Sequence, residues 1–351
     1  MAAYTTIDDP SAYFKVQLWT GDGTAIGSGG KAITFDDTDT DMQPDLVWIK
    51  ERSSTSGHQV IDAVRGTTKH LETEDDGQES TQSEGLTTFG SDGFTVGENG
   101  AVNQSSQTYV AWCWKANGSG SANSVGDISS TVSANTTSGI SIVKYQGSGT
   151  GSDTVGHGGV QPDFITIKAT SAASDWITTT KDIAGYIYIS TTAALTSNST
   201  WLPLTSTTFE LENTWGAYNT SGRDYIAYLF KSIQGFSAIG SYKGNGNAAN
   251  NTFVYTGFKV GWVLIKRSSS SGEGWFIFDS TRSPANLNVN ELRADTNSAE
   301  TTGSHYIDFL SNGFKPKTAG AGIGGSGDTY IYLAFAEAPF VNSKGVPCNA
   351  R

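Results

Sequence analysis

Charge, cysteine and histidine are scarce in this chain of 351 residues. Only 16% of the residues are charged, and the sequence holds 2 cysteines and 4 histidines. Cys113 and Cys348 are too few for a disulfide framework, and no cysteine–histidine set supports a structural zinc site. No run of residues approaches the eighteen consecutive apolar positions of a membrane-spanning helix, so we expect no membrane insertion.

The charges that are present are mostly negative. The formal net charge is −12, from 34 acidic and 22 basic residues. Such a surface repels phosphate backbones, so a nucleic-acid partner is not expected.

Glycine and aromatic side chains are abundant instead. The chain contains 42 glycines, and 11% of its residues are Phe, Trp or Tyr. Aromatic and β-branched residues favour strands, while glycine and small polar residues favour the turns between them. No long stretch has the Ala, Leu, Glu and Lys content of an amphipathic helix, so the composition predicts an all-β fold.

One stretch occurs three times, at residues 107–116, 223–232 and 328–337, and reads Gln-Thr-Tyr-Val-Ala-Trp-Cys-Trp-Lys-Ala in its first copy. The leading tyrosines, Tyr109, Tyr225 and Tyr330, lie a little over a hundred residues apart, which matches the size of small β-domains. Each copy is apolar at both alternating sets of positions. This pattern predicts a central strand that is covered on both faces of its sheet.

Other strand and turn signals recur in the same order. Residues 43–50 (Gln-Pro-Asp-Leu-Val-Trp-Ile-Lys) are matched by 161–168 and, without the proline, by 259–266. The tight-turn signals Asp-Gly and Asn-Gly stand within 89–96 and 309–315, whereas the second repeat lacks this turn. We therefore predict three tandem β-sandwich modules of about 100 residues, with a jelly-roll strand order equally open and each module having its own core.

The predicted boundaries follow from these repeats. They are an N-terminal arm at 1–12, repeat one at 13–116, a polar linker at 117–126, repeat two at 127–232, repeat three at 233–338 and a C-terminal extension at 339–351. Residues 127–137 are expected to add an edge strand to repeat two. Only two residues separate repeats two and three, so these are expected to pack rigidly together.

Motifs of enzymes are few. Residues 322–327 match the Gly-x-Gly-x-x-Gly pattern, but they lead into a strand rather than the helix that a dinucleotide site requires. There is no Gly-x-Ser-x-Gly elbow, and the four histidines all fall in predicted loops at positions that differ between repeats. Glu72, Glu74, Asp75 and Asp76 resemble a solvated acidic loop.

Two carboxylates could still serve a glycoside hydrolase. Glu210 and Glu212 flank Leu211 and could project from one face of a sheet, which is the arrangement that a polysaccharide-degrading enzyme needs across a cleft. The same spacing is common on any solvent-facing strand. The chain is therefore predicted not to be an enzyme and to need no cofactor.

A calcium site is the one metal site that the sequence suggests. Asp37, Asp39 and Asp41 alternate on a predicted loop and could converge as oxygen ligands. The glycine and the distant glutamate of an EF-hand loop are missing, and a solvated acidic turn explains the same pattern.

Loop aromatics suggest a glycan-binding surface. Most tryptophans fall within strand signals, whereas Trp201, Trp215 and Tyr218 lie in the most irregular part of repeat two. Their rings could stack against the C–H-rich faces of sugars, although exposed aromatics mark interfaces of several kinds.

Four motifs carry a resemblance to a known family. They are Ile-Asp-Asp-Pro-Ser-Ala-Tyr-Phe at 7–14, the stretch at 43–50, Ser-Asp-Gly-Phe-Thr-Val at 91–96 and Tyr-Val-Ala-Trp-Cys-Trp-Lys-Ala at 109–116. With them the chain resembles repeat-containing virion structural proteins of tailed bacteriophages of marine bacteria. The resemblance covers nearly the whole chain and is weakest at 183–222. It implies lectin-like sandwich modules and a particle component of the tail-fibre, tail-appendage or capsid-decoration type.

The expectation is therefore a non-enzymatic virion structural protein that assembles in the host cytoplasm. Its partners would be other virion proteins, further copies of itself as a homo-oligomer, and host-surface glycans. A glycan-binding adhesin and, behind it, a polysaccharide-degrading enzyme are the alternatives.

Overall fold

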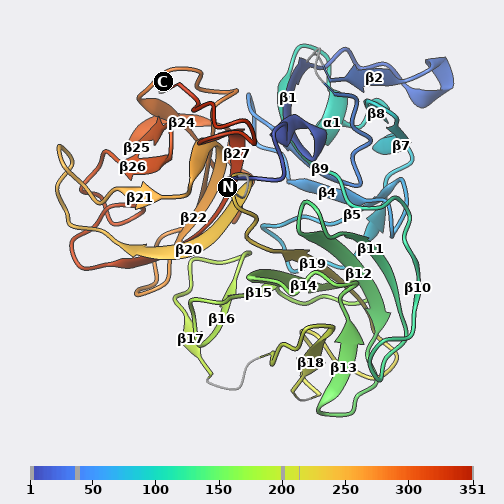
Figure 1. The fold of residues 1–351 in the computed structure, drawn as a ribbon. Coiled ribbons are helices and arrows are strands. Elements are labelled where there is room, and N and C mark those ends of the chain that lie inside the picture. The colour runs from blue at the N-terminus through green and yellow to red at the C-terminus, as the bar shows by residue number, and fades with distance from the viewer. Residues whose placement is uncertain (1–3, 36–39, 199–201, 213, 350–351) are drawn as a thin grey trace.

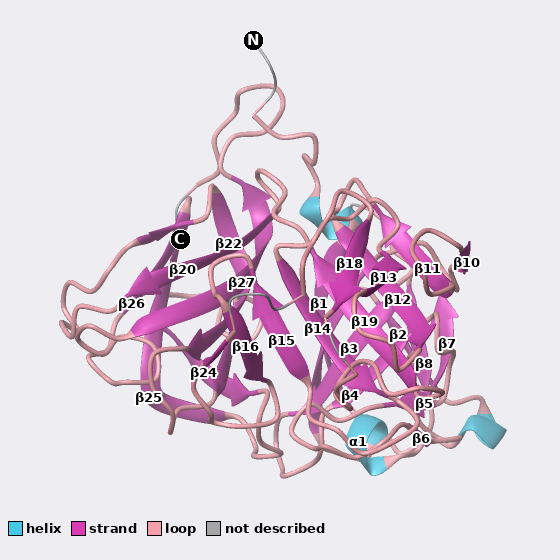
Figure 2. Cartoon of the chain, turned by 90° about the horizontal axis from the view of Figure 1, so that it is seen from below, coloured by secondary structure: helices cyan, strands magenta, loops and turns pink. Residues whose placement is uncertain are grey.

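The computed structural model describes residues 4–35, 40–198, 202–212 and 214–349, and strands and loops make up nearly all of it (Figure 2). Its helical elements are single turns: η1 (Pro10–Ala12), η2 (Ile26–Ser28) and α1 (Gly100–Asn103). The all-β prediction is confirmed. None of the helices in these ranges is long and apolar enough to cross a membrane.

Sheet one lies in the blue and cyan lobe of Figure 1. It contains, in spatial order, β1 (Phe14–Thr20), β9 (Thr108–Trp114), β3 (Leu46–Glu51) and β4 (Gln59–Asp62). A smaller sheet is formed by β2 (Lys31–Thr34), β8 (Gly93–Val96) and β7 (Leu86–Gly90), and a short ladder by β5 (Lys69–His70) and β6 (Ser80–Thr81).

Sheet two lies in the green lobe. Its order is β10 (Ser121–Asn123), β11 (Ser130–Asn135), β12 (Ile140–Gln146), β19 (Asp224–Phe230), β14 (Phe164–Ala169), β15 (Ile177–Thr180), β16 (Gly185–Tyr188) and β17 (Thr196–Ser197). The separate pair β13 (Asp153–Gly156) and β18 (Thr208–Leu211) completes this lobe. Residues 127–137 do add a strand, β11, but it is not at the edge. The predicted linker at 117–126 contains β10, which pairs with the outer side of β11 and is itself the edge strand.

Sheet three lies in the orange and red lobe. Its order is β20 (Ser237–Lys243), β27 (Thr329–Pro339), β22 (Phe258–Arg267), β23 (Trp275–Asp279), β24 (Asn288–Arg293), β25 (Thr301–Leu310), β26 (Gly313–Pro316) and β21 (Val254–Tyr255). The Asn312-Gly313 signal lies at the β25–β26 turn, and Asp92-Gly93 lies at the β7–β8 turn, as the sequence predicted.

The three repeated stretches form the middle strands β9, β19 and β27. Each lies between the first strand of its repeat (β1, β12 or β20) and the strand that carries the second sequence marker (β3, β14 or β22). Val110, Trp112 and Trp114 face one side of sheet one, while Tyr109, Ala111 and Cys113 face the other. This alternation is the one expected for a central strand buried on both faces.

The core differs from the expectation of one separate core per repeat. The outer faces of the three sheets have cores of their own, but their inner faces share a single apolar core. Trp114 lies within it and is 5.9 Å from Phe230 and 5.7 Å from Trp262, measured between ring centroids. Three sheets with covered outer faces still present large apolar inner faces, and packing these together removes them from water.

Candidate functional site

The leading tyrosine of each repeated stretch holds a loop in the same way. Its hydroxyl donates to the carbonyl oxygen nine residues earlier and accepts from the N–H group five residues earlier, at 2.7–3.0 Å. The sets are Tyr109 with Gly100 and Gln104, Tyr225 with Gly216 and Thr220, and Tyr330 with Ala321 and Gly325. Both backbone groups are thereby satisfied without water, which closes the loop over the outer core.

A second recurring contact crosses from one repeat to another. A residue at the start of β4, β15 and β23 (His58, Trp176 and Trp275) donates a ring N–H to a carbonyl oxygen of a neighbouring repeat. Trp176 bonds to Glu72 and Trp275 to Tyr188, both at 2.7 Å, and His58 Nε2 lies 2.9 Å from the carbonyl oxygen of Arg293. Repeat two therefore bonds to repeat one, three to two, and one to three. We call these three contact regions the seams.

Backbone hydrogen bonds reinforce every seam at matching positions. One set consists of Glu79 N–H to Thr170, Leu195 N–H to Ser268 and Glu300 N–H to Arg52, at 2.8–3.0 Å. The other set consists of Ser174 N–H to Asp76, Gly272 N–H to Thr192 and Ser56 N–H to Asn297, at 2.7–3.0 Å. Because each set occurs once per seam, each repeat bonds to both of the others, and we call this closed arrangement the ring.

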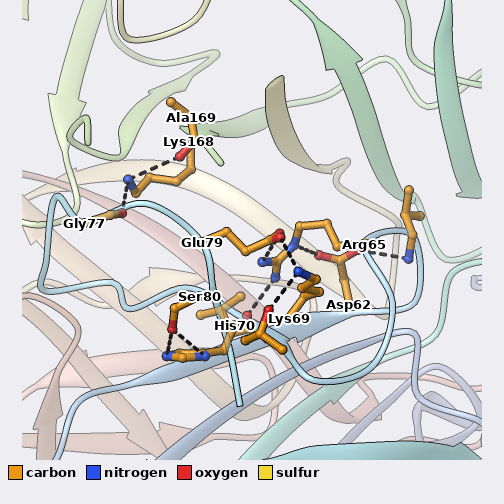
Figure 3. Close-up of polar contacts among 12 residues, drawn as sticks. Asp62, Arg65, Lys69, His70, Gly77, Glu79, Ser80, Lys168 and Ala169 are labelled. Carbon is orange, nitrogen blue, oxygen red and sulfur yellow. Dashed lines mark hydrogen bonds and ion pairs between the residues drawn. The ribbon is translucent and has the colours of Figure 1, made fainter. Parts of the chain in front are cut away.

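A buried ion pair lies in the seam between repeats one and two (Figure 3). Arg65 contacts the Asp62 carboxylate through Nε, and its Nη1 lies 3.3 Å from Glu79. Tyr228, from repeat two, donates its hydroxyl to Asp62 Oδ2 at 2.7 Å. Burial by itself would lower the pKa of Arg65, but the adjacent Asp62 carboxylate more than offsets this, so the pKa is raised and the guanidinium stays charged.

The seam between repeats one and three has the same construction. Arg282 Nε lies 2.5 Å from Asp279 Oδ2, and its Nη1 lies 2.8 Å from Glu300. Trp112, from repeat one, donates its indole N–H to Asp279 at 3.1 Å, and Arg52 approaches Glu300 to 2.8 Å. In both seams the arginine follows the aspartate by three residues, and the crossing donor stands three residues after the leading tyrosine.

The third seam lacks the ion pair. By strand register, Thr180 opposite Phe164 corresponds to Asp62 opposite Leu46, and Ile183 stands where the arginine would be. The crossing position is Leu333, which belongs to the shared core, and Ile183 packs against that core. The positions of the aspartate, the arginine and the crossing donor therefore all carry uncharged side chains in this seam, so no buried ion is left unpaired.

Each repeat also buries one lysine at the end of its second sequence marker. Lys50, Lys168 and Lys266 are fully buried. Lys168 Nζ donates to the carbonyl oxygens of Gly77 at 2.7 Å and Asp76 at 3.0 Å, across the seam (Figure 3). Burial lowers the pKa of each of the three lysines to about 8.

The lysines make stability depend on pH in the alkaline range. The unfolded chain holds these protons up to pH about 10.4, whereas the folded chain releases them from about pH 8. Because the folded state binds fewer protons in that interval, we expect the free energy of unfolding to rise between pH 8 and 10, on the order of 1 kcal/mol per lysine. Burial raises the pKa of Tyr109 and Tyr330 to about 12, so ionisation of tyrosines in the unfolded chain reverses the trend at higher pH.

Urea unfolding midpoints at a series of pH values measure this effect. Lys266→Met should flatten the rise by about a third, because it removes one of three similar groups. Burial also raises the pKa of the Cys113 and Cys348 thiols, so their ionisation in the unfolded chain opposes part of the rise. A Lys266→Met profile that matches the wild type from pH 8 to 9.5 would contradict the assignment.

The residues predicted from sequence for ligand and metal binding lie partly outside the described residues. Trp201, Asp37 and Asp39 lie outside the described residues, and Asp41 is exposed. In the described ranges no three His, Cys, Asp or Glu side chains lie close enough to hold a metal ion. Tyr218 is fully buried in the outer core of repeat two, so its proposed role as an exposed stacking ring is wrong.

Trp215 remains partly exposed. Its ring lies 5.0 Å from Tyr186 and 5.8 Å from Tyr218, between centroids. Tyr186 in turn lies 5.5 Å from Tyr188, and both tyrosines are partly exposed. The irregular part of repeat two therefore presents an aromatic cluster beside β16, the last strand but one of sheet two.

The carboxylates and histidines also differ from expectation. Glu74 is not solvated, since it accepts the His58 N–H at 3.0 Å and burial raises its pKa to about 7. His58 and His157 are fully buried, and His70 and His305 lie in strands rather than loops. Burial lowers the pKa of His58 to about 3, with Lys50 adding to the effect, so its ring is neutral. Glu210 is partly buried on β18, and Glu212 accepts from Asn198 at 3.2 Å.

The seam residues are the polar groups that sequence reasoning missed. Two signals could have found them. Asp-x-x-Arg begins at the last residue of β4 and of β23, in repeats one and three, and a lysine ends the second marker in all three repeats. Both recur at fixed distances from the strand signals, which is unusual for surface charges.

The comparison with protein families covers almost the same span as the ring. A family model described as a domain of unknown function (DUF7483) matches residues 9–339. The chain belongs to this family. The match extends from η1 to the end of β27, so the DUF7483 domain includes all three large sheets and the seams between them. A search of the curated proteins found no match.

Proposed function

We propose that this DUF7483 chain is a non-enzymatic structural protein of a bacteriophage particle, as a fibre, tail-appendage or capsid-decoration component. In this proposal three β-sandwich units, related by an internal repeat, act as one rigid body and present their loops to other virion proteins or to a host surface. The resemblance to virion structural proteins supports a place in the phage particle. The seams support the proposal that the three units act as one rigid body.

One observation supports the proposal that the units act as one rigid body. Buried groups that could do chemistry recur at matching positions, namely the three lysines, two Asp–Arg pairs and the ring N–H donors. Lys168, Lys266, both aspartates and the three ring donors each contact a neighbouring repeat. Groups that recur at the contacts between repeats stabilise the assembly of the ring, and a passive particle component requires that stability.

Immunogold labelling of purified particles tests the proposal. Antibodies against the chain should decorate virions at a defined part of the head, tail or fibre, and preadsorption with the purified chain should abolish the label. Chain found only in the soluble fraction of infected cells, with particles unlabelled after mild disruption, would contradict it.

Glycan binding is the second candidate, and the aromatic cluster around Trp215 favours it. Rings within 5–6 Å of each other offer the broad apolar surface on which a sugar stacks, and the adjacent Asn198–Glu212 pair provides amide and carboxylate groups for hydroxyls.

If this surface binds a host glycan, Trp215→Ala should weaken the saturable binding measured on a glycan array by about tenfold. The control is Tyr255→Ala, which removes an exposed ring on repeat three and should leave binding unchanged. Equal losses in both variants, or no glycan bound by the wild type, would remove the candidate. Release of reducing sugars that is lost in Glu210→Gln or Glu212→Gln would instead establish the hydrolase alternative.

A further inference from the structure

Strand β1 is an edge strand, and no described strand pairs with its outward backbone groups. The Gly21 N–H donates to Gln107, and the Lys115 N–H donates to Tyr13, so odd-numbered residues of this strand bond to β9. Because bonding alternates along an antiparallel pair, Val16, Leu18 and Thr20 direct their N–H and C=O groups away from the sheet. Among the described residues, one hydrogen bond reaches these outward groups: the Gln17 side-chain amide donates to the Leu18 carbonyl oxygen at 3.2 Å.

The equivalent edges of the other two sheets are protected. In sheet two, β11 pairs with β12 from Ser130 opposite Tyr145 to Asn135 opposite Ile140. In sheet three, the turn before β20 bonds to Ser237 and to the Ile239 N–H, and Thr252 donates to the Lys243 carbonyl oxygen. Strand β11 is therefore an example, within this chain, of an antiparallel strand that completes this edge, and no described strand does so in sheet one.

The usual devices that keep an edge strand from pairing are missing from β1. Its sequence, Phe-Lys-Val-Gln-Leu-Trp-Thr, has no proline, and its pairing with β9 is regular without a bulge. Its single charge, Lys15, is 5% exposed and turned back, with Nζ 2.7 Å from the Thr40 carbonyl oxygen and over the Phe35 ring. Val16 and Leu18 are only partly buried against the shared core.

We propose that β1 pairs antiparallel with β1 of a second copy of this chain, so that two four-stranded sheets join into one across a twofold axis. The register centres on Gln17, which lies opposite its own copy. This places Val16 opposite Leu18 and Phe14 opposite Thr20, so the outward groups of one strand meet those of the other.

The sequence of β1 fits this self-pairing. No like charges lie opposite each other, since Lys15 falls opposite Trp19 of the second copy, and the half-buried Val16 and Leu18 side chains become covered. A groove of about 270 Å³ lies beside Phe14 and Val16, lined also by Ser11, Gly261 and Ser280. Thr20 of the incoming strand approaches this groove, so the ring leaves space for the strand end.

A charge exchange at Gln17 tests both the partner and the register. Opposite residues that do not share hydrogen bonds have close side chains, so Gln17→Lys and Gln17→Glu each place two like charges face to face. In sedimentation velocity over a wide range of protein concentrations, we expect the wild type to dimerise and each variant to associate about tenfold more weakly. An equimolar mixture of the two variants should restore dimerisation to at least the wild-type level.

A second pair of variants separates edge pairing from folding. Leu18→Pro removes an outward N–H that the monomer does not use, so its circular dichroism should match the wild type while dimerisation is lost. Ser241→Pro makes the same change at the matching position of β20 and should dimerise normally. A monomeric wild type, a mixture that stays monomeric, or Leu18→Pro that dimerises normally would each overturn the proposal.

The biological purpose of this self-association rests on the proposed role in the phage particle. The experiments that test β1 pairing are independent of that role. Unlabelled particles would refute the virion role while the purified chain still dimerises through β1. Labelled particles with a chain that remains monomeric would refute the β1 pairing alone.

Discussion

Replacing Asp279 with alanine should lower the free energy of unfolding by about 3–5 kcal/mol, which is the largest effect that we expect from a single polar substitution. The carboxylate is fully buried, and it accepts bonds from Arg282 and from Trp112 of another repeat. Its removal leaves the buried guanidinium with Glu300 as its remaining carboxylate partner and leaves the indole N–H without an acceptor. Urea denaturation followed by tryptophan fluorescence measures the change.

The third seam supplies a matched control. Asp279→Thr combined with Arg282→Ile installs the residues that repeat two has at these positions, Thr180 and Ile183. Because this double variant removes both charges, it should cost less than Asp279→Ala alone, as replacements of whole buried ion pairs generally do. A double variant less stable than the single one would show that the pair contributes net stability, and a single variant within about 1 kcal/mol of wild type would show that the ion pair is weakly coupled to folding.

Replacing Trp114 with alanine should cost about 3–5 kcal/mol and should leave unfolding as a single transition. The ring is 1% exposed, and its centroid lies 5.3 Å from Phe14, 5.8 Å from Phe335 and 5.9 Å from Phe230, so it contacts the strands of all three sheets. A cavity at this point weakens every seam together. We therefore expect the melting transition of the whole chain to move down without splitting.

Differential scanning calorimetry distinguishes this result from independent modules. If each repeat folded on its own core alone, Trp114→Ala would destabilise repeat one and leave a second transition at the wild-type temperature. The control is Ala111→Gly, on the opposite face of the same strand, where Ala111 belongs to the outer core of repeat one. Two transitions in Trp114→Ala would show that the shared core does not couple the repeats.

The candidate site shows what kind of information the sequence carries. The recurring lysine and the Asp-x-x-Arg spacing are visible in the sequence, but their role is not, because surface turns often contain such residues. A lysine that ends a marker strand and is fully buried, such as Lys168, acquires its carbonyl partners at Asp76 and Gly77 from a loop of another repeat, some ninety positions earlier. Nothing in the local pattern identifies those partners.

Sequence reasoning was also misleading in the opposite direction, for an aromatic residue expected at the surface. Tyr218 stands in an irregular stretch and resembles a surface ring, but the closing of the loop places it in the outer core. Burial depends on which segments fold over a residue, and sequence periodicity is informative about this only within regular strands.

The sequence by itself determined the all-β class, the positions and two-faced burial of the three middle strands, the tight turns at Asp92-Gly93 and Asn312-Gly313, and the recurrence of these signals. These features arise from alternation and turn chemistry within a few residues. Only the tertiary structure decided that the inner faces share one core, that ring N–H groups and ion pairs cross the seams, and that β1 is left open. Those properties depend on contacts between groups often more than a hundred residues apart, whose distances no local pattern sets.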